Sequence, residues 1–107
     1  MKIAILANRG SVEPDVREQF PDAEIVVNQV VTDMCHYFEV AKAFSEEVIV
    51  RTKMGEEVLF VLACPVVIGY LLGGIFVHSP RKIFLATLDY TTRKYEVLDV
   101  SNHLRMH

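Results

Sequence analysis

The sequence predicts a small Rossmann-like α/β domain, with a mainly parallel sheet flanked by helices and an antiparallel hairpin at the C-terminal end. Short runs of branched and aromatic residues alternate with segments of helical periodicity along the chain. Such alternation is typical of β-α-β crossovers around a parallel sheet. The last two apolar runs are separated only by the turn "TTRK", and this spacing indicates a hairpin.

The first half of the chain predicts two strand–helix pairs. Lys2–Ala7 is a short apolar run that ends in the polar turn Asn8–Ser11. Val12–Phe20 has the pattern of a short amphipathic helix. Ala23–Val31 is rich in β-branched residues and predicts the second strand. Thr32-Asp33 then offers an N-cap for a second, longer helix.

The end of that second helix has two interpretations. Apolar residues recur at helical spacing from Met34 to Val48. Val48–Val50 either continues the helix to Met54, with Gly55 as its C-terminal cap, or forms a strand of a hairpin. We favour the helix.

The longest apolar run, Val58–Val77, is uncharged and raises the question of a membrane span. Pro65 would interrupt a continuous helix near the middle of this run. Val58–Ala63 has the character of a buried strand, and Val66–Val77 that of a buried helix with Pro65 at its first position. We therefore predict a strand, a Cys-Pro turn and a helix in a soluble core instead of a membrane span.

The remaining segments complete one domain. Strands at Ile83–Tyr90 and Tyr95–Val100 form the expected hairpin, so that residues 1–100 make a single domain and residues 101–107 a polar tail. The hydrophobic content of 51% is high for a soluble domain of this length, which suggests a homodimer face or a contact with another chain.

Charge and cysteine usage narrow the classes of function. The net charge is −3 and there is no basic tract, which argues against binding to long nucleic acid. Cys35 and Cys64 form no CxxC motif, and we expect two reduced core thiols in a cytoplasmic protein. The spacing of His, Cys, Asp and Glu predicts no metal site, and no cofactor motif such as GxGxxG is present.

Polar residues that follow the strands are expected to meet at one edge of the sheet, because ligands bind beyond the carboxyl ends of parallel strands. Cations and helix N-termini there predict a phosphate site, although Asn8–Ser11 is also compatible with a simple turn and helix cap. His78 and Arg81 follow a helix and should lie at the opposite edge. The residues expected at the carboxyl edge are Asn8, Arg9, Gly10, Ser11, Asn28, Gln29, Thr32, Asp33, Cys64, Pro65, Val66, Val67, Asp89, Tyr90, Thr91, Thr92, Arg93 and Lys94.

The segment Val58–Val100 resembles the closing segment of CARF and SAVED domains, the sensors of cyclic oligonucleotides in CRISPR and CBASS antiviral defence. In those domains an apolar strand leads through a short turn into an "xxAxxLG" helix, followed by a strand and a Tyr-containing hairpin. Here "VVIGYLLGG" stands where that helix starts, with Leu72-Gly73 in the place of its Leu-Gly. The chain is also similar in length to the single-domain CRISPR-associated ring nucleases.

This resemblance implies a homodimer in which two carboxyl-edge sites share one cyclic oligoadenylate. It also implies metal-independent ring cleavage by in-line attack of a ribose 2′-hydroxyl. The residues expected to act on the phosphate are Arg9, Ser11 and Lys94. Those expected to contact the ligand are Asn8, Gly10, Asn28, Cys64, Pro65, Val66, Tyr90, Thr92 and Arg93. The competing hypothesis is a small α/β adaptor that docks a larger partner through its apolar helix and binds no small molecule. Independently of this choice, we expect Gly69 and Gly73 to permit close packing of the helix on the sheet, or of helix on helix across a dimer, instead of contacting a ligand.

Overall fold

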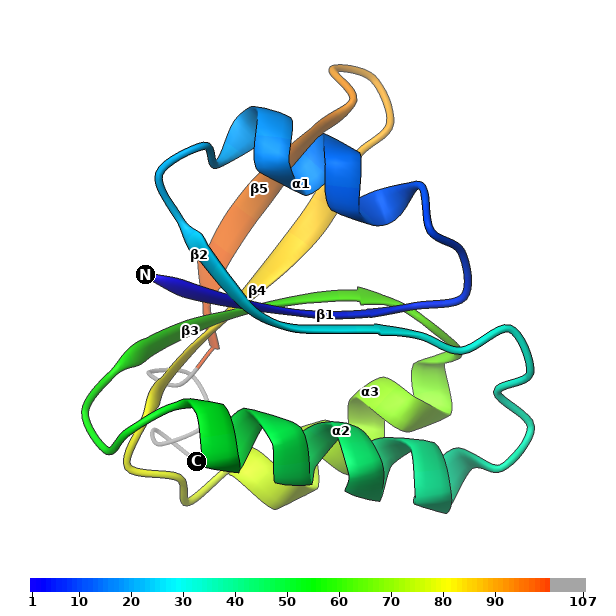
Figure 1. Cartoon of the computed structure of the whole chain (residues 1–107), viewed down its shortest axis with the longest axis vertical. Coiled ribbons are helices and arrows are strands. Elements are labelled where there is room, and N and C mark those ends of the chain that lie inside the picture. Colours follow the sequence, from blue (N-terminus) through cyan, green and yellow to red (C-terminus); the bar gives the residue numbers. More distant parts are fainter. Residues whose placement is uncertain (101–107) are drawn as a thin grey trace.

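The computed structural model describes residues 1–100, and they form a five-stranded sheet in the order β2-β1-β3-β4-β5 with three helices (Figure 1). Strands β1 to β4 are parallel, and β5 pairs antiparallel with β4. The predicted α/β fold with its C-terminal hairpin is therefore confirmed, while the tail 101–107 lies outside the described residues. The elements are β1 (Lys2–Ala7), α1 (Val12–Gln19), β2 (Glu24–Val30), α2 (Tyr37–Arg51), β3 (Glu57–Ala63), α3 (Val66–Phe76), β4 (Lys82–Asp89) and β5 (Lys94–Asp99).

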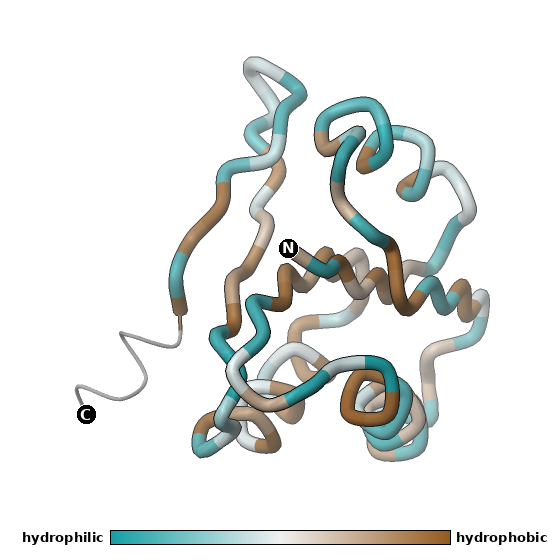
Figure 2. The backbone as a smooth tube through the Cα atoms, turned by 60° about the vertical axis from the view of Figure 1, so that its left-hand side comes forward, coloured by the Kyte–Doolittle hydropathy of each residue, from teal (hydrophilic) through white to brown (hydrophobic). Residues whose placement is uncertain are grey.

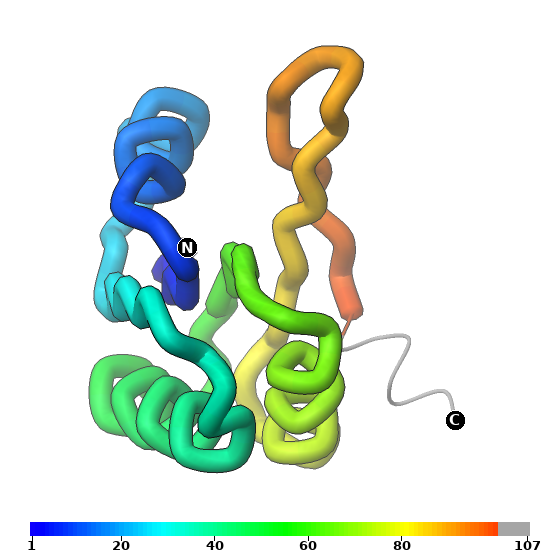
Figure 3. Tube along the Cα trace, turned by 90° about the vertical axis from the view of Figure 1, so that its right-hand side faces the viewer, coloured from blue at the N-terminus to red at the C-terminus, as the bar shows by residue number. Residues whose placement is uncertain are grey.

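The sheet separates two apolar clusters. Helices α2 and α3 cover one face, and α1 covers part of the other (Figures 1 and 3). Alternate residues of β1 serve the two clusters: Ala4 and Leu6 face α2 and α3, whereas Ile3 and Ile5 face α1. All four side chains are completely buried, which explains why this central strand is apolar without alternation. Figure 2 shows the same predominance of apolar residues through the central strands.

The uncharged run folds as predicted, with Glu57–Ala63 as strand β3 and Val66–Phe76 as helix α3. Pro65 is the N-cap of α3 and not its first helical residue as expected, because its ψ of 144° is extended. In residues 1–100 no helix is both long enough and apolar enough to traverse a bilayer.

Helix α2 is shorter than the sequence predicted at both ends. The carboxylate Oδ1 of Asp33 accepts the amide N–H of Cys35 at 3.2 Å, so it stabilises a local turn, and His36 is the N-cap. At the other end the helix includes Val48–Val50, as favoured, but stops at Arg51 because Thr52 is extended. Gly55 is not the helix cap; its φ of +85° belongs to the turn that precedes β3.

Arg81 binds the C-terminal end of α2 at the edge opposite to the carboxyl ends of the parallel strands, as the sequence placed it. The side chain is 9% exposed. Its Nε donates to Thr52 Oγ1 at 2.6 Å, and one terminal nitrogen donates to the carbonyls of Thr52 and Ile49 at 3.1 and 3.3 Å. These bonds satisfy carbonyls that the helix itself leaves without partners.

We expect Arg81→Ala to lower the free energy of unfolding by about 2–3 kcal/mol, because it removes charge-assisted hydrogen bonds from buried acceptors. Urea unfolding measures the change. Arg51→Ala is the control, since Arg51 is exposed and, within residues 1–100, its side chain forms an ion pair only with Glu47 on the same helix. Equal stability of the two variants would contradict this role of Arg81.

Candidate functional site

The ends of β3 and β4 separate at the carboxyl edge of the sheet. Strand β3 follows β1 to the pair Ala7–Ala63, and the amide of Asn8 donates to the carbonyl of Ala63 at 3.1 Å. In contrast, β3 pairs with β4 only as far as Val61–Ala86. Beyond Ala86, β4 continues with β5 as its neighbour on the other side (Figure 3). The ladder therefore opens between β3 and the protruding hairpin.

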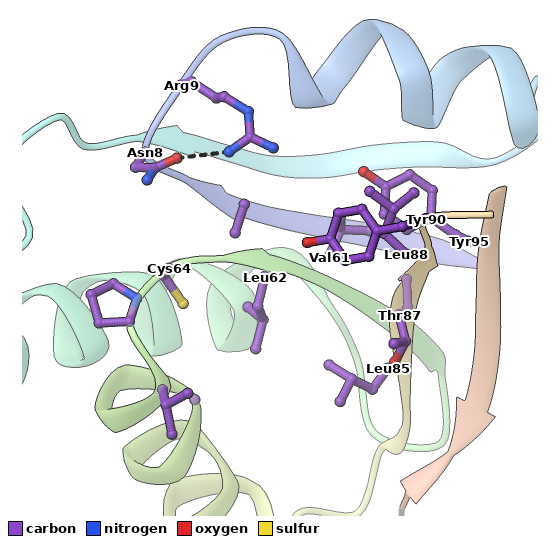
Figure 4. Close-up of a pocket in the computed structure, with 15 residues that line it drawn as sticks. Asn8, Arg9, Val61, Leu62, Cys64, Leu85, Thr87, Leu88, Tyr90 and Tyr95 are labelled. Carbon is purple, nitrogen blue, oxygen red and sulfur yellow. Dashed lines mark hydrogen bonds between the residues drawn. The ribbon is translucent and has the colours of Figure 1, made fainter. Parts of the chain in front are cut away.

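An open cavity of about 710 Å³, here called the carboxyl-edge cavity, occupies this opening. Its walls come from the end of β1, the end of β3 with the start of α3, the last part of β4 and the hairpin (Figure 4). In a parallel sheet of this kind the ligand usually binds where the strand order reverses, which here is between β1 and β3. Because those two strands stay paired, the opening lies one strand further along. The lining residues are Asn8, Arg9, Val61, Leu62, Ala63, Cys64, Pro65, Val66, Gly69, Leu85, Ala86, Thr87, Leu88, Tyr90 and Tyr95.

Arg9 supplies a cation at the mouth of the cavity. Figure 4 shows its guanidinium extending above the opening toward the side where Tyr90 and Tyr95 lie. One terminal nitrogen donates to Asn8 Oδ1 at 3.2 Å. Within residues 1–100, none of the ion pairs includes Arg9. An exposed guanidinium without a carboxylate partner can bind an anionic ligand without first breaking an ion pair.

The N-terminus of α3 opens on the same cavity. Val66, its first residue, lines the wall, and within the described chain no side chain caps this helix. The amide of Ile68 is bonded to the carbonyl of Pro65 at 3.0 Å, a tight first turn. Free N–H groups and the helix dipole add partial positive charge to that of Arg9. The two features together make this wall suited to a negatively charged group.

Tyr95 is a cavity residue that the sequence interpretation treated only as part of a strand. The hairpin register pairs it with Leu88 and so brings its ring to the cavity. Burial, and secondarily Asp15, raises the pKa of the Tyr95 phenol, while Arg9 opposes the shift. The phenol is therefore neutral at physiological pH. Tyr90, which is 85% exposed, adds a second ring at the mouth. The sequence did contain a signal for this position of Tyr95, because the four-residue turn between the two strands sets the register of the hairpin.

The structure brings six of the predicted site residues together and leaves the others outside. Asn8, Arg9, Cys64, Pro65, Val66 and Tyr90 line the carboxyl-edge cavity, whereas Gly10, Ser11, Asn28, Thr92, Arg93 and Lys94 do not. Among the described contacts, the Ser11 hydroxyl does not cap α1. Asn28 Nδ2 donates to Glu13 Oε2 at 2.7 Å. Burial raises the pKa of the half-buried Cys64 thiol, which keeps it protonated near neutral pH. The expectation that Cys35 is also a core thiol is wrong, because Cys35 is exposed.

The hairpin tip holds Arg93 and Lys94 beyond the cavity. Both side chains are exposed, and none of the ion pairs in residues 1–100 includes either of them. Arg93 has a φ of 58°, in the left-handed region, and its amide donates to the carbonyl of Asp89 at 2.7 Å. Asp89 Oδ1 accepts the amide of Thr91 at 2.9 Å, so this carboxylate stabilises the turn.

Gln19 connects α1 to the hairpin and thereby positions Tyr95. Its Nε2 donates to the Tyr95 carbonyl and its Oε1 accepts the Tyr95 amide, each at 2.7 Å. A single side chain thus serves both backbone groups of Tyr95 in the way that a neighbouring strand would.

We expect Gln19→Ala to release the hairpin, because two backbone groups of Tyr95 lose their partner. Amide hydrogen exchange at Tyr95 should become at least tenfold faster, the equivalent of the ~1.4 kcal/mol that one or two hydrogen bonds contribute. Glu18→Ala, an exposed neighbour, is the matched control. Unchanged protection of Tyr95 in Gln19→Ala would contradict the positioning role.

In comparisons with known proteins, no family model, curated protein or solved structure matches the chain. Within residues 1–100, no group of three His, Cys, Asp or Glu side chains is arranged to hold a metal ion.

Proposed function

We propose that this protein binds a cyclic oligoadenylate in the carboxyl-edge cavity and acts in cytoplasmic antiviral defence. The observation that carries the proposal is the combination, in one opening, of the unpaired Arg9 guanidinium, the uncapped start of α3 and the rings of Tyr90 and Tyr95. The resemblance of Val58–Val100 to CARF and SAVED domains supports the same class of ligand.

Each part of the cavity suits one part of such a ligand. A guanidinium and a helix N-terminus attract phosphate oxygens. Tyrosine rings offer stacking surfaces for bases, worth about 1–3 kcal/mol for each stacked base. The cavity volume of about 710 Å³ lies in the range of small-molecule sites. The exposed Arg93 and Lys94 of the hairpin tip add positive charge near the opening and favour approach of a polyanion.

Binding, and not cleavage, is the function that the geometry favours. Ring cleavage by the in-line route would require groups that hold the phosphate and stabilise its developing charge. Of the three residues expected in that role, Arg9 lines the cavity, while Ser11 and Lys94 lie outside it. Cleavage is therefore an outcome that the binding experiment is designed to detect.

The experiment mixes the purified protein with labelled cyclic tri-, tetra- and hexa-adenylate in EDTA, and records both thermal shift and product by chromatography. A shift of the melting temperature with intact ring supports a sensor, because a ligand that binds only the folded state stabilises it. Linear product with a 2′,3′-cyclic phosphate would extend the function to a metal-independent ring nuclease.

The adaptor hypothesis predicts a different result. None of the three rings would then shift the melting temperature, no product would form, and a protein partner would co-purify with the chain. Linear oligoadenylate of the same length is the ligand control, since it carries the same bases and a similar charge without the ring. A result in which linear and cyclic forms shift the melting temperature equally would contradict recognition of the ring.

A further inference from the structure

Helix α3 is apolar around its whole circumference although only one side of it is buried. Ile68, Leu72 and Phe76 face the core, and no residue of the helix carries a charge. On the outer face Val66 is 89% exposed and Tyr70 81% exposed. A helix that is apolar on every side is normally covered on every side. The outer face of α3, defined here as Val66, Val67, Tyr70, Gly74 and Ile75, therefore has the composition of a contact surface.

The glycines of α3 have no packing role among the described residues. A Cβ atom built on Gly69, Gly73 or Gly74 meets nothing within 4 Å. The prediction that Gly69 and Gly73 permit close packing of this helix on its own sheet is therefore wrong. Each glycine inside a helix costs roughly 0.5–1 kcal/mol relative to alanine. The remaining role is to let another chain approach the helix.

A cleft lies beside these glycines. It has a volume of about 260 Å³ and is bordered by α3 on one side and by Ile83 and Leu85 of β4 on the other. Gly69 and Gly73 form its rim, and Phe60, Leu62, Leu72, Phe76 and Val100 complete its almost entirely apolar wall. Figure 3 shows α3 beside α2 and below the strands of the hairpin. Because Gly69 and Gly73 belong to the same helix as the outer face, the cleft and the outer face adjoin.

We propose that a second copy of this chain covers the outer face of α3, with Tyr70 of each copy inserted into the glycine-rimmed cleft of the other. The helix carries both the protruding ring and the cleft. Such a pair of features is self-complementary about a two-fold axis, as an isologous dimer requires. Contact between the α3 helices of two copies also avoids the cost of desolvating a charge, because α3 carries none.

The available area matches a dimer interface. Phe38 of α2 is 74% exposed and lies with Leu71 and Ile75 along the groove between α2 and α3. Together with the outer face, these side chains expose roughly 600–700 Å² of mostly apolar surface, close to the ~800 Å² that each partner contributes to a stable interface. Lys42 and Glu46 border the groove with charges of both signs, as expected for a polar rim.

The test is the mass of the protein in solution without nucleotide, measured by sedimentation across micromolar concentrations. We expect the wild type at twice the 12.2 kDa chain mass. Tyr70→Glu places a charge in the cleft, and Gly73→Leu fills the cleft; both should yield 12.2 kDa monomers or weaken dimerisation at least a hundredfold. Because the Cβ of residue 73 meets open space, Gly73→Leu should fold at least as stably as the wild type.

Ala43→Glu is the matched control, an exposed position of α2 outside the groove, and it should remain dimeric. A monomeric wild type would overturn the proposal, and so would a dimer that Tyr70→Glu and Gly73→Leu leave intact. If the wild-type protein binds neutral lipid vesicles and does not self-associate, the proposal is overturned and the outer face of α3 is assigned to a membrane surface instead. Since no nucleotide is present, failure of this proposal is distinct from failure of cyclic oligoadenylate binding.

Discussion

Phe60→Ala is expected to lower the free energy of unfolding by about 3–5 kcal/mol, the usual cost of removing a buried phenylalanine ring. Phe60 is 4% exposed and lies on β3 between two other rings. Its centroid is 5.6 Å from that of Phe44 and 5.1 Å from that of Phe76, with interplanar angles of 72° and 79°. These edge-to-face contacts join α2, the sheet and α3, so that one truncation weakens three elements.

A loss of this size is a large part of the 5–15 kcal/mol that stabilises a typical domain. Chemical denaturation with a constant m-value measures it. Phe60→Leu retains most of the apolar volume and should cost about half as much or less. Val50→Ala, at a side chain 76% exposed on α2, should change stability by less than ~0.5 kcal/mol. A loss below 1 kcal/mol in Phe60→Ala would show that the three rings do not act as a unit.

Most of the fold is predictable because each strand is bounded by a strong local signal. The uncharged run Val58–Val77 is the clearest case: Pro65 divides it, and the two halves become β3 and α3 within one residue of the predicted limits. The start of α2 was wrong because Asp33 has two possible acceptor roles. A short carboxylate side chain can cap a helix or stabilise a turn two residues ahead, and only the tertiary context decides between them.

The site was less predictable than the fold. Knowing that Asn8, Arg9 and Cys64 follow parallel strands is enough to place them at one edge. It is not enough to place the opening, which depends on where β3 leaves β4, a property of long-range pairing. For the same reason the rule included Ser11 and Asn28, which lie at the edge but outside the cavity, and missed Tyr95 from the last strand.

Arg9→Ala is expected to weaken binding of cyclic oligoadenylate by about 10- to 100-fold, because a hydrogen bond to a charged partner contributes roughly 1.5–3 kcal/mol. Arg17→Ala is the matched control: it removes the same charge nearby on α1, but Arg17 is paired with Glu13 at 2.7 Å and does not line the cavity. Arg9→Lys separates charge from geometry, since lysine keeps the charge but loses the two-pronged contact with phosphate.

Titration of labelled ligand at fixed salt measures these affinities, and the salt concentration must be held constant because phosphate contacts weaken as it rises. Neither Arg9→Ala nor Arg9→Lys should alter the melting temperature of the free protein appreciably, since Arg9 is exposed and, within residues 1–100, its side chain hydrogen-bonds only to its neighbour Asn8. If Arg9→Ala, Ser11→Ala and Arg93→Ala combined bind the ring as tightly as the wild type, the anion site lies elsewhere. If Arg9→Ala and Arg17→Ala weaken binding equally, the effect is one of net charge, and the guanidinium above the cavity makes no specific contact with the ligand.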